Sequence, residues 1–368
     1  MMIPGTEQMR ARIQAILEQK PGQKAKAIAA QLRTDKLEVN RILHAHKDVF
    51  VQDPETYAWS LAALRIDLGN HCWLGAESFE NALLAAGSPL DSSATNRVTF
   101  VVGEDCKILL EALARLLAIS NQLASLGKVV SLDFSASRST LTYLNRIGFI
   151  DLLRNDVQIL PKRPRVSAAA TYEGNSNAVV ELKAIDHEDP DDGIPDLLRM
   201  SFVACAGDQY NVAAHTVIAE LFGNVTEHSG ATSAGFAGLQ YYAGGRRRHI
   251  QTVISDGGRG IVGTLTPILK DRFPVVARKI AKSSIDPRVA LLQEVFSQGG
   301  ISQVEESGRG LGLKRSGQCA HKYNALVSVR QETFELKIEH VGEDIRFSHR
   351  LDLVRIAGTH ICFDFLLD

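Results

Sequence analysis

The stretch "VAAHTVIAELFGNVTEH", residues 212–228, has the apolar spacing of an amphipathic helix. Glu220 and Asn224 are four residues apart, so they lie one turn apart on a flank beside the apolar stripe. A carboxylate and an amide oxygen suit Mg²⁺, and Glu220 could also orient a water molecule. The stripe itself consists of Ala214, Val217, Ile218, Leu221, Phe222 and Val225.

A predicted hairpin follows this helix and runs directly into a carboxylate flanked by glycines. The hairpin turns at Gly244-Gly245 and ends at Asp256, with Gly258 and Gly260 next along the chain. A carboxylate at a strand end can accept a hydrogen bond from the exocyclic amine of a base. Glycines at this point let backbone come close to a ligand. The segment therefore predicts a place for a nucleobase.

A second glycine-rich motif, "GRGLG", precedes a predicted helix that runs to Tyr323. Backbone N–H groups at a helix N-terminus favour phosphate, which predicts a phosphate cradle. Its spacing fits neither the Rossmann nor the P-loop pattern. The motif consists of Gly308, Arg309, Gly310, Leu311 and Gly312, and Gly358-Thr359 later begins a final predicted strand.

In this order the four motifs resemble the GHKL ATPase family (Bergerat fold) over about residues 170–368. The resemblance implies ATP and Mg²⁺ as ligands, with Asn224 the Mg²⁺ ligand and Glu220 the general base. It implies that Asp256, with Gly258 and Gly260, holds adenine, and that Thr359 closes on that Asp. Residues 308–312 would surround the phosphates, and residues 262–307 would form a mobile lid that closes over nucleotide.

The N-terminal residues 6–61 predict three helices followed by a hairpin around Asp53-Pro54-Glu55. The pattern resembles a winged helix-turn-helix domain over about 55 residues. In that family the third helix enters a groove of nucleic acid. The implied contacts are Lys36, Asn40, Arg41 and His44. Lys and Arg only slightly outnumber Asp and Glu here, so binding to DNA and binding to another protein both stay open.

Residues 97–161 alternate predicted strands and helices, which favours an α/β layer. The segment "VVSLDFSASRSTLTYLNRIGFIDLL" resembles STAS-type domains, which are protein-interaction modules. In that family a serine at the start of the helix after the central strand accepts phosphate, which points to Ser137 or Ser139. The family's Asp-Ser-Ser-Gly pattern is missing, so a serine that simply caps a helix is the alternative.

The predicted fold class is therefore multidomain α/β and α+β, with a winged helix, a small STAS-like α/β layer and a C-terminal Bergerat-type α/β sandwich. The expected parts are a winged helix over 1–62, a helical connector over 63–96, a STAS-like module over 97–162, a linker over 163–176, and a GHKL domain over 177–368.

Composition is that of an ordinary globular protein, with 45% hydrophobic and 23% charged residues among 368. Lys and Arg number 41 and Asp and Glu 42, so total charge gives no sign of a nucleic-acid or membrane partner. The five cysteines form no Cys-x-x-Cys pair, and we interpret them as buried free thiols. With no stretch apolar enough to span a membrane, a cytoplasmic location is expected.

Three functions are compatible with these motifs. In the first, ATP binding and slow hydrolysis switch contacts between domains, protomers or partners. In the second, the chain is a protein serine kinase related to anti-sigma factors, with the STAS-like module as substrate or regulator. In the third, it is a nucleotide-sensing DNA-binding regulator without turnover. Histidine autophosphorylation is disfavoured because none of the 11 histidines has the required sequence context.

Overall fold

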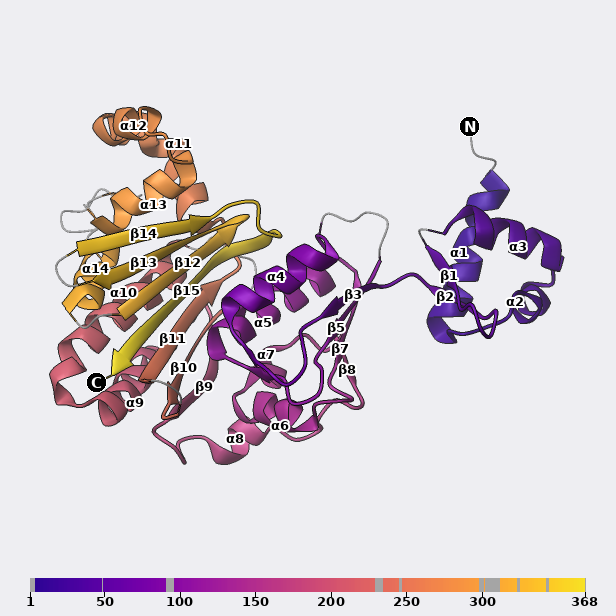
Figure 1. Cartoon of the computed structure of the whole chain (residues 1–368), viewed down its shortest axis with the longest axis horizontal. Helices are drawn as coiled ribbons and strands as arrows, with labels where there is room; N and C mark the ends of the chain where they lie inside the picture. Colours follow the sequence, from indigo (N-terminus) through magenta and orange to yellow (C-terminus); the bar gives the residue numbers. More distant parts are fainter. Residues whose placement is uncertain are drawn as a thin grey trace.

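The computed structural model describes residues 4–47, 49–90, 96–228, 234–244, 247–297, 301, 312–322, 325–341 and 344–367. The fold is a mixed α/β structure with several sheets (Figure 1). Three hydrophobic cores organise it: one in the N-terminal unit, and one against each face of the largest sheet. In the described part of the chain, no helix combines the length and apolar character that crossing a membrane requires.

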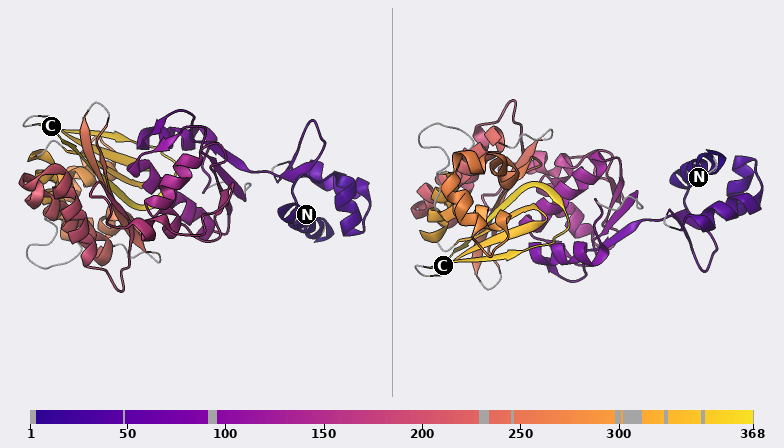
Figure 2. Two further views of the ribbon diagram at one scale, coloured as in Figure 1. Left: turned by 90° about the horizontal axis from the view of Figure 1, so that it is seen from below. Right: turned by 90° about the horizontal axis from the view of Figure 1, so that it is seen from above.

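The N-terminal unit consists of three helices and a two-stranded hairpin, as predicted. They are α1 (Pro4–Gln19), α2 (Ala25–Leu32), α3 (Lys36–Ala45), β1 (Phe50–Gln52) and β2 (Trp59–Leu61). Asp35 caps α3 by accepting from the Leu37 N–H at 3.1 Å. Ile13, Ile28 and Trp59 are among the buried side chains of its own core. Both views in Figure 2 place this unit apart from the rest of the chain.

The middle module contains a four-stranded parallel sheet in the order β3-β5-β7-β8. Its strands are β3 (Leu64–Asp67), β5 (Arg97–Val101), β7 (Val129–Asp133) and β8 (Gln158–Leu160), with β4 (Trp73–Leu74) and β6 (Lys107–Ile108) as a separate parallel pair. The helices are α4 (Ala76–Ala86), α5 (Leu110–Ser125), α6 (Arg138–Arg146) and α7 (Phe149–Leu152). The predicted alternation of strands and helices over 97–161 is confirmed.

The prediction of a helical connector over 63–96 is wrong in part. Residues in this segment form β3, which pairs with β5 in parallel register, and α4 packs on the same core. Segment 63–96 forms a strand as well as a helix because Ile66 and Leu68 are apolar. Pairing with the sheet buries their side chains in the core beside α4. The expected linker over 163–176 likewise contains a short helix, α8 (Ala168–Tyr172), capped by Ser167.

The C-terminal part is built on a seven-stranded antiparallel sheet in the order β14-β13-β12-β15-β11-β10-β9. Its strands are β9 (Val179–Ile185), β10 (Gly235–Tyr242), β11 (Arg248–Asp256), β12 (Ala325–Glu332), β13 (Phe334–Val341), β14 (Asp344–Arg350) and β15 (Ile356–Leu367). Beside them are α9 (Gly193–Ala206), a 3₁₀ turn (Asp208–Tyr210), α10 (Asn211–His228), α11 (Gly260–Arg272), α12 (Pro274–Ala281), α13 (Pro287–Ser297) and α14 (Gly312–Lys322). The predicted hairpin and final strand are confirmed as β10, β11 and β15.

The expected lid over 262–307 is largely helical where the structure describes it. Helices α11, α12 and α13 account for most of residues 260–297. Val289 and Leu292 on α13 are completely buried and belong to the core between the sheet and α10. The apolar side chains of α13 are therefore part of that core, and the lid stays a prediction.

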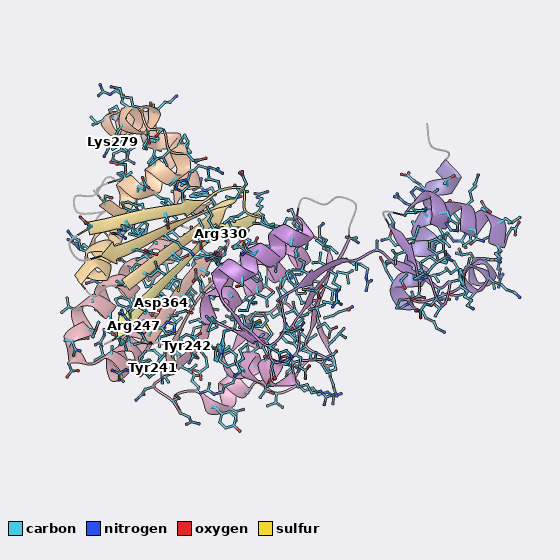
Figure 3. All side chains as sticks on the ribbon, viewed as in Figure 1. Tyr241, Tyr242, Arg247, Lys279, Arg330 and Asp364 are labelled. Carbon is cyan, nitrogen blue, oxygen red and sulfur yellow. The ribbon has the colours of Figure 1, made fainter. Side chains whose placement is uncertain are left out.

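Helix α5 of the middle module lies across the face of the seven-stranded sheet opposite to α10 (Figure 1). Side chains from the sheet satisfy the free N–H groups at its first turn. Leu110 N–H donates to Tyr242 Oη at 2.8 Å, and Glu111 N–H donates to Gln251 Oε1 at 3.3 Å. Figure 3 labels Tyr242 on the sheet. Helix α5 therefore connects the middle module to the seven-stranded sheet of the C-terminal part.

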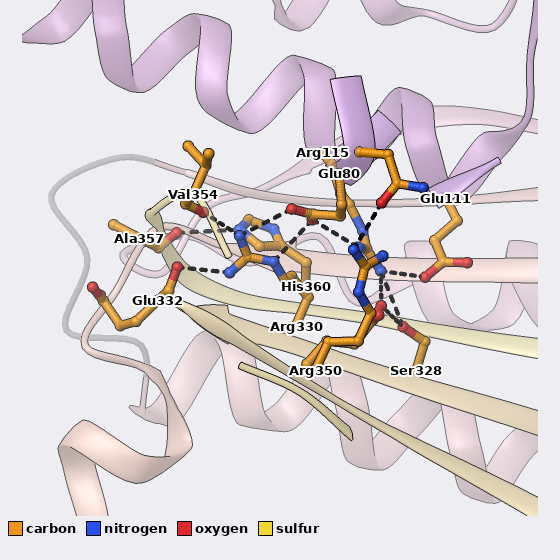
Figure 4. A network of polar contacts seen from close by, with 12 residues as sticks. Glu80, Glu111, Arg115, Ser328, Arg330, Glu332, Arg350, Val354, Ala357 and His360 are labelled. Atoms are coloured by element: carbon orange, nitrogen blue, oxygen red, sulfur yellow. Dashed lines mark hydrogen bonds and ion pairs between the residues drawn. The ribbon is translucent and has the colours of Figure 1, made fainter. Parts of the chain in front are cut away.

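A buried ionic network joins the same two modules (Figure 4). Arg115 of α5 pairs with Glu80, Glu111 and Glu335, and only Glu111 of these is noticeably exposed. Arg330 of β12 pairs with Glu80 at 2.9 Å, with both side chains completely buried. Burial and the charges of Arg330 and Arg115 lower the pKa of nearby His360 to about 3, so this imidazole is neutral. Removing one member would leave an uncompensated charge.

Candidate functional site

Helix α10 carries the first two predicted site residues. Glu220 and Asn224 are both half-buried and lie one turn apart, as their spacing predicts. Ala214, Val217 and Leu221 are buried against the sheet side, which orients the helix. Its partners are α9 and α14 along its length and β11 of the sheet. The flank that bears Glu220 and Asn224 remains partly accessible.

Asp256 is the last residue of β11, and its side chain is only 8% exposed. Its Oδ1 accepts a hydrogen bond from Gly258 N–H at 2.7 Å. Thr359 of β15 is its register partner across the sheet and also contacts the carboxylate. Burial raises the pKa of Asp256 to about 6, although the hydrogen bonds from Gly258 and Thr359 oppose this shift. The structure thus brings Asp256, Gly258 and Thr359 together.

Two glycines next to Asp256 occupy backbone conformations that other residues rarely adopt. Gly260 begins α11 with φ of +71°, and Gly358 precedes Thr359 with φ of +96°. A Cβ added to Gly358 would lie 1.9 Å from the Asp256 carbonyl oxygen. The two chain segments can approach this closely only because Gly358 has no side chain. The close approach forms a narrow backbone cradle around Asp256.

Gln331 is a member of this site that the sequence analysis missed. It is 1% exposed, and its Nε2 donates to Thr359 Oγ1 at 3.0 Å. Its Oε1 accepts from the Val262 N–H in the first turn of α11 at 3.2 Å. One amide therefore connects Thr359 to the start of the segment expected to be the lid. The signal in the sequence was weak: a polar residue near the end of an otherwise buried strand.

The second glycine motif cannot be placed. Gly308, Arg309, Gly310 and Leu311 lie outside the described residues, and Gly312 is the first residue of α14. Helix α14 packs beside α10, so the motif leads into a helix that neighbours the one carrying Glu220 and Asn224. Among the residues whose positions are described, no group of three or more His, Cys, Asp or Glu side chains is arranged to hold a metal ion.

A cavity of about 620 Å³ lies between the C-terminal half of α5 and the end of the sheet. Asp256 and Gly257 form part of its wall, so it reaches the same strand end from the α5 side. Gln122 of α5 and Ala357 of the sheet also line it. The Gln122 amide donates to Ala357 O and accepts from Ala357 N–H, each at 2.9 Å. Ala357 is therefore held two residues before Thr359.

The other predicted site residues, on α3 and at the start of α6, are distant in sequence from Asp256. On α3, Lys36, Arg41 and His44 are exposed and Asn40 is half-buried, while the His44 ring packs edge-on against Trp59 at 4.8 Å. Ser137 precedes α6, but its buried side chain makes no capping hydrogen bond and instead lies 2.9 Å from Thr140 Oγ1. Ser139, in the first turn of α6, is exposed.

Comparison with protein-family models finds no match to this chain, and comparison with curated proteins finds no similar sequence.

Proposed function

We propose that this chain is an ATP-binding regulatory protein in which Mg·ATP binding and slow hydrolysis change the contacts of the middle module. The observation that carries the proposal is the buried carboxylate of Asp256 at the end of β11, beside Thr359 and the Gly258 N–H. A buried carboxylate is unfavourable for folding unless donors compensate its lost hydration, and a ligand that donates to it would reduce that cost. The exocyclic amine of adenine is such a donor.

The residues present fit ATP and Mg²⁺. The positive φ of Gly260 and Gly358 lets the chain segments beside Asp256 lie close together, which would hold the carboxylate at the end of β11 as an acceptor for the amine of a base. Asn224 would hold Mg²⁺ by its amide oxygen, and Mg²⁺ needs one or two protein ligands besides water and phosphate. The bound ion would neutralise phosphate charge. Glu220, one turn before Asn224, would accept a proton from an attacking water.

The contact between Gln122 and Ala357 supports a route by which nucleotide alters the middle module. Ala357 and Gly358 directly precede Thr359 in the chain. A shift of Thr359 upon adenine binding would therefore change the geometry of the two hydrogen bonds between Gln122 and Ala357. Gln122 lies on α5, whose first turn is also bonded to the sheet. A ligand shifts such an equilibrium only if it binds the two arrangements unequally. The expected consequence is a small rotation or shift of α5.

The burial of Ser137 favours the ATPase switch over a kinase that phosphorylates this serine. At 2% exposure, with its Oγ beside Thr140 and the Cys106 carbonyl, Ser137 is inaccessible to a phosphoryl donor without local unfolding. Ser139 is exposed and stays available as an acceptor. DNA contact by α3 is a separate proposal, tested by salt-dependent binding to a duplex.

Phosphate release by the purified full chain tests the hydrolytic part of this proposal. Glu220→Gln removes the proton acceptor and keeps the size of the side chain. We expect it to bind Mg·ATP but to lose at least about 100-fold in turnover, in line with the loss of a general base. Equal turnover in the two proteins would exclude Glu220 as the base. Phosphate found on the protein rather than in solution would favour the kinase.

A further inference from the structure

Two loops of the middle module repeat the same order of features. Each follows a strand, begins with glycine, continues with two polar residues and a cysteine, and leads into a two-residue strand and a helix. The first is "GNHCWL" at 69–74 and the second is "GEDCKI" at 103–108. Their cysteines, Cys72 and Cys106, are separated by 34 positions.

Backbone hydrogen bonds hold these loops side by side in register. Gly103 N–H donates to Gly69 O at 3.1 Å, and Lys107 N–H donates to Cys72 O at 2.8 Å. Trp73 and Lys107 are then register partners in the parallel pair of β4 and β6. A Cβ on Gly103 would lie 2.5 Å from the Gly69 carbonyl oxygen, so the close approach requires glycine here.

This register brings the two thiols into direct contact. Cys72 Sγ lies 3.4 Å from Cys106 Sγ, and both thiols are free. A disulfide bond has a sulfur separation of about 2.05 Å and joins residues whose backbones are as close as those of paired strands. The sulfurs therefore need to approach each other by only about 1.4 Å. Cys106 is completely buried, whereas Cys72 is half-buried.

We propose that Cys72 and Cys106 form a reversible oxidation site, at which hydrogen peroxide converts the two thiols into an intramolecular disulfide. The more accessible Cys72 reacts first: its thiol loses a proton, the thiolate attacks one peroxide oxygen, and the O–O bond breaks. The departing hydroxide takes up that proton, and the products are a Cys72 sulfenic acid and water. Cys106 sulfur then attacks the Cys72 sulfur, and hydroxide leaves with the Cys106 proton as a second water. Both sulfurs are oxidised together by two electrons, and hydrogen peroxide is reduced.

The environment of each thiol supports this order of events. Burial raises the pKa of the Cys106 thiol to about 12, and its contact with Cys72 adds to the effect, so Cys106 stays protonated until a sulfenic acid forms beside it. Cys106 also lies four residues before Leu110, the first residue of α5. The Cys106 carbonyl accepts from Thr140 Oγ1 at 2.6 Å. A disulfide would therefore form where α5 and α6 both begin.

The test uses the full chain, reduced and then treated with stepwise additions of hydrogen peroxide under native conditions. We expect loss of two alkylatable thiols, a mass decrease of two hydrogens, and a peptide linking Cys72 to Cys106 that dithiothreitol separates. Cys205→Ser is the matched control, because the Cys205 thiol donates to the backbone carbonyl of Asn177. This variant should oxidise like the wild type.

Two further variants separate the steps. Cys106→Ser should accumulate a dimedone-reactive sulfenic acid on Cys72, and Cys72→Ser should leave Cys106 as a thiol at the same peroxide concentration. The proposal is overturned if peroxide drives Cys72 of the wild type to sulfinic acid without a linked peptide. It is equally overturned if the linked peptide forms only in denaturant. The wild-type peptide map decides the matter even if a variant fails to fold.

Discussion

Arg330 of β12 and Glu80 of α4 form an ion pair at 2.9 Å in which both side chains are completely buried. Arg330 comes directly before Gln331, which hydrogen-bonds to Thr359 beside Asp256. Glu80 belongs to the middle module and also binds Arg115. The same strand therefore carries an intermodule ion pair and a contact to the candidate nucleotide site, on adjacent residues that face opposite sides of the sheet.

Replacing Glu80 by Gln should strongly destabilise the protein. Two buried guanidinium groups, those of Arg115 and Arg330, would lose a shared carboxylate, and loss of one partner in a buried pair costs about 3–5 kcal/mol. Urea unfolding measures the change. Asp67→Asn, in an exposed pair with Arg65, is the control and should cost less than about 1 kcal/mol. Similar losses in the two variants would show that the network contributes nothing through burial.

Replacing Asp256 by Asn should stabilise the fold near neutral pH. The pKa of Asp256 is about 6 in the folded state, above its ordinary value, so folding binds this proton more tightly. The contribution of this proton to the free energy of unfolding is therefore complete below about pH 4, and it is lost as the pH rises through about 6. At pH 7.5 the Asn variant should therefore gain about 1–3 kcal/mol, and the gain should shrink at pH 4.

Unfolding curves at both pH values measure this gain, with Asp344→Asn as a control at an exposed carboxylate. A variant that is less stable than the wild type at pH 7.5 would contradict the assignment of Asp256 as a carboxylate destabilised by burial.

Much of the fold followed from local patterns. The apolar stripes of α5 and α10 and the strand ending at Asp256 were predicted because one helix face or one strand carries the signal. The β3 strand was missed because four residues are too short to give a clear pattern, and only the pairing with β5 shows its role. The burial of α13, within the segment predicted to be the lid, depends on contacts with distant elements, which sequence spacing does not reveal.

In the candidate site, too, local motifs were predicted and contacts between distant residues were not. Asp256, Gly258 and Thr359 were predicted and do lie together, because glycine and carboxylate at strand ends leave a motif in the sequence. Gln331 and Gln122 were missed because each acts through a hydrogen bond to a residue distant in sequence. The Cys72 and Cys106 thiols were read as separate buried cysteines, because only the parallel register of two loops brings them together.

Gly358→Ala should be far more harmful than the same change at another glycine with positive φ. Gly358 has φ of +96° and Gly87 has φ of +91°, so the conformational cost of Ala is similar at both. A Cβ at Gly87 meets nothing within 4 Å, whereas one at Gly358 would lie 1.9 Å from Asp256 O. We expect Gly87→Ala to cost about 1 kcal/mol and Gly358→Ala about 2 kcal/mol more. Equal melting temperatures would contradict the cradle geometry.

Gln122→Ala should weaken Mg·ATP binding although the amide of Gln122 bonds to Ala357 rather than to Asp256 or Thr359. Its two hydrogen bonds to Ala357 position the segment that leads to Thr359, and coupling of this kind is worth about 5- to 150-fold in affinity. Asn121→Ala is the matched control, because the Asn121 amide bonds to Leu152 and Arg154 within the middle module. Equal affinities in both variants would exclude a route through Gln122.

Calorimetric titration of the full chain with Mg·ATP, beside Asp256→Asn, tests whether Asp256 binds the nucleotide. In the variant an NH₂ group replaces a carboxylate oxygen, so a donor faces the adenine amine. We predict saturable binding with a dissociation constant of about micromolar magnitude for the wild type, and no measurable binding for the folded variant. Absence of binding by the wild type at millimolar Mg·ATP, or equal affinity in the two proteins, would refute nucleotide binding at Asp256.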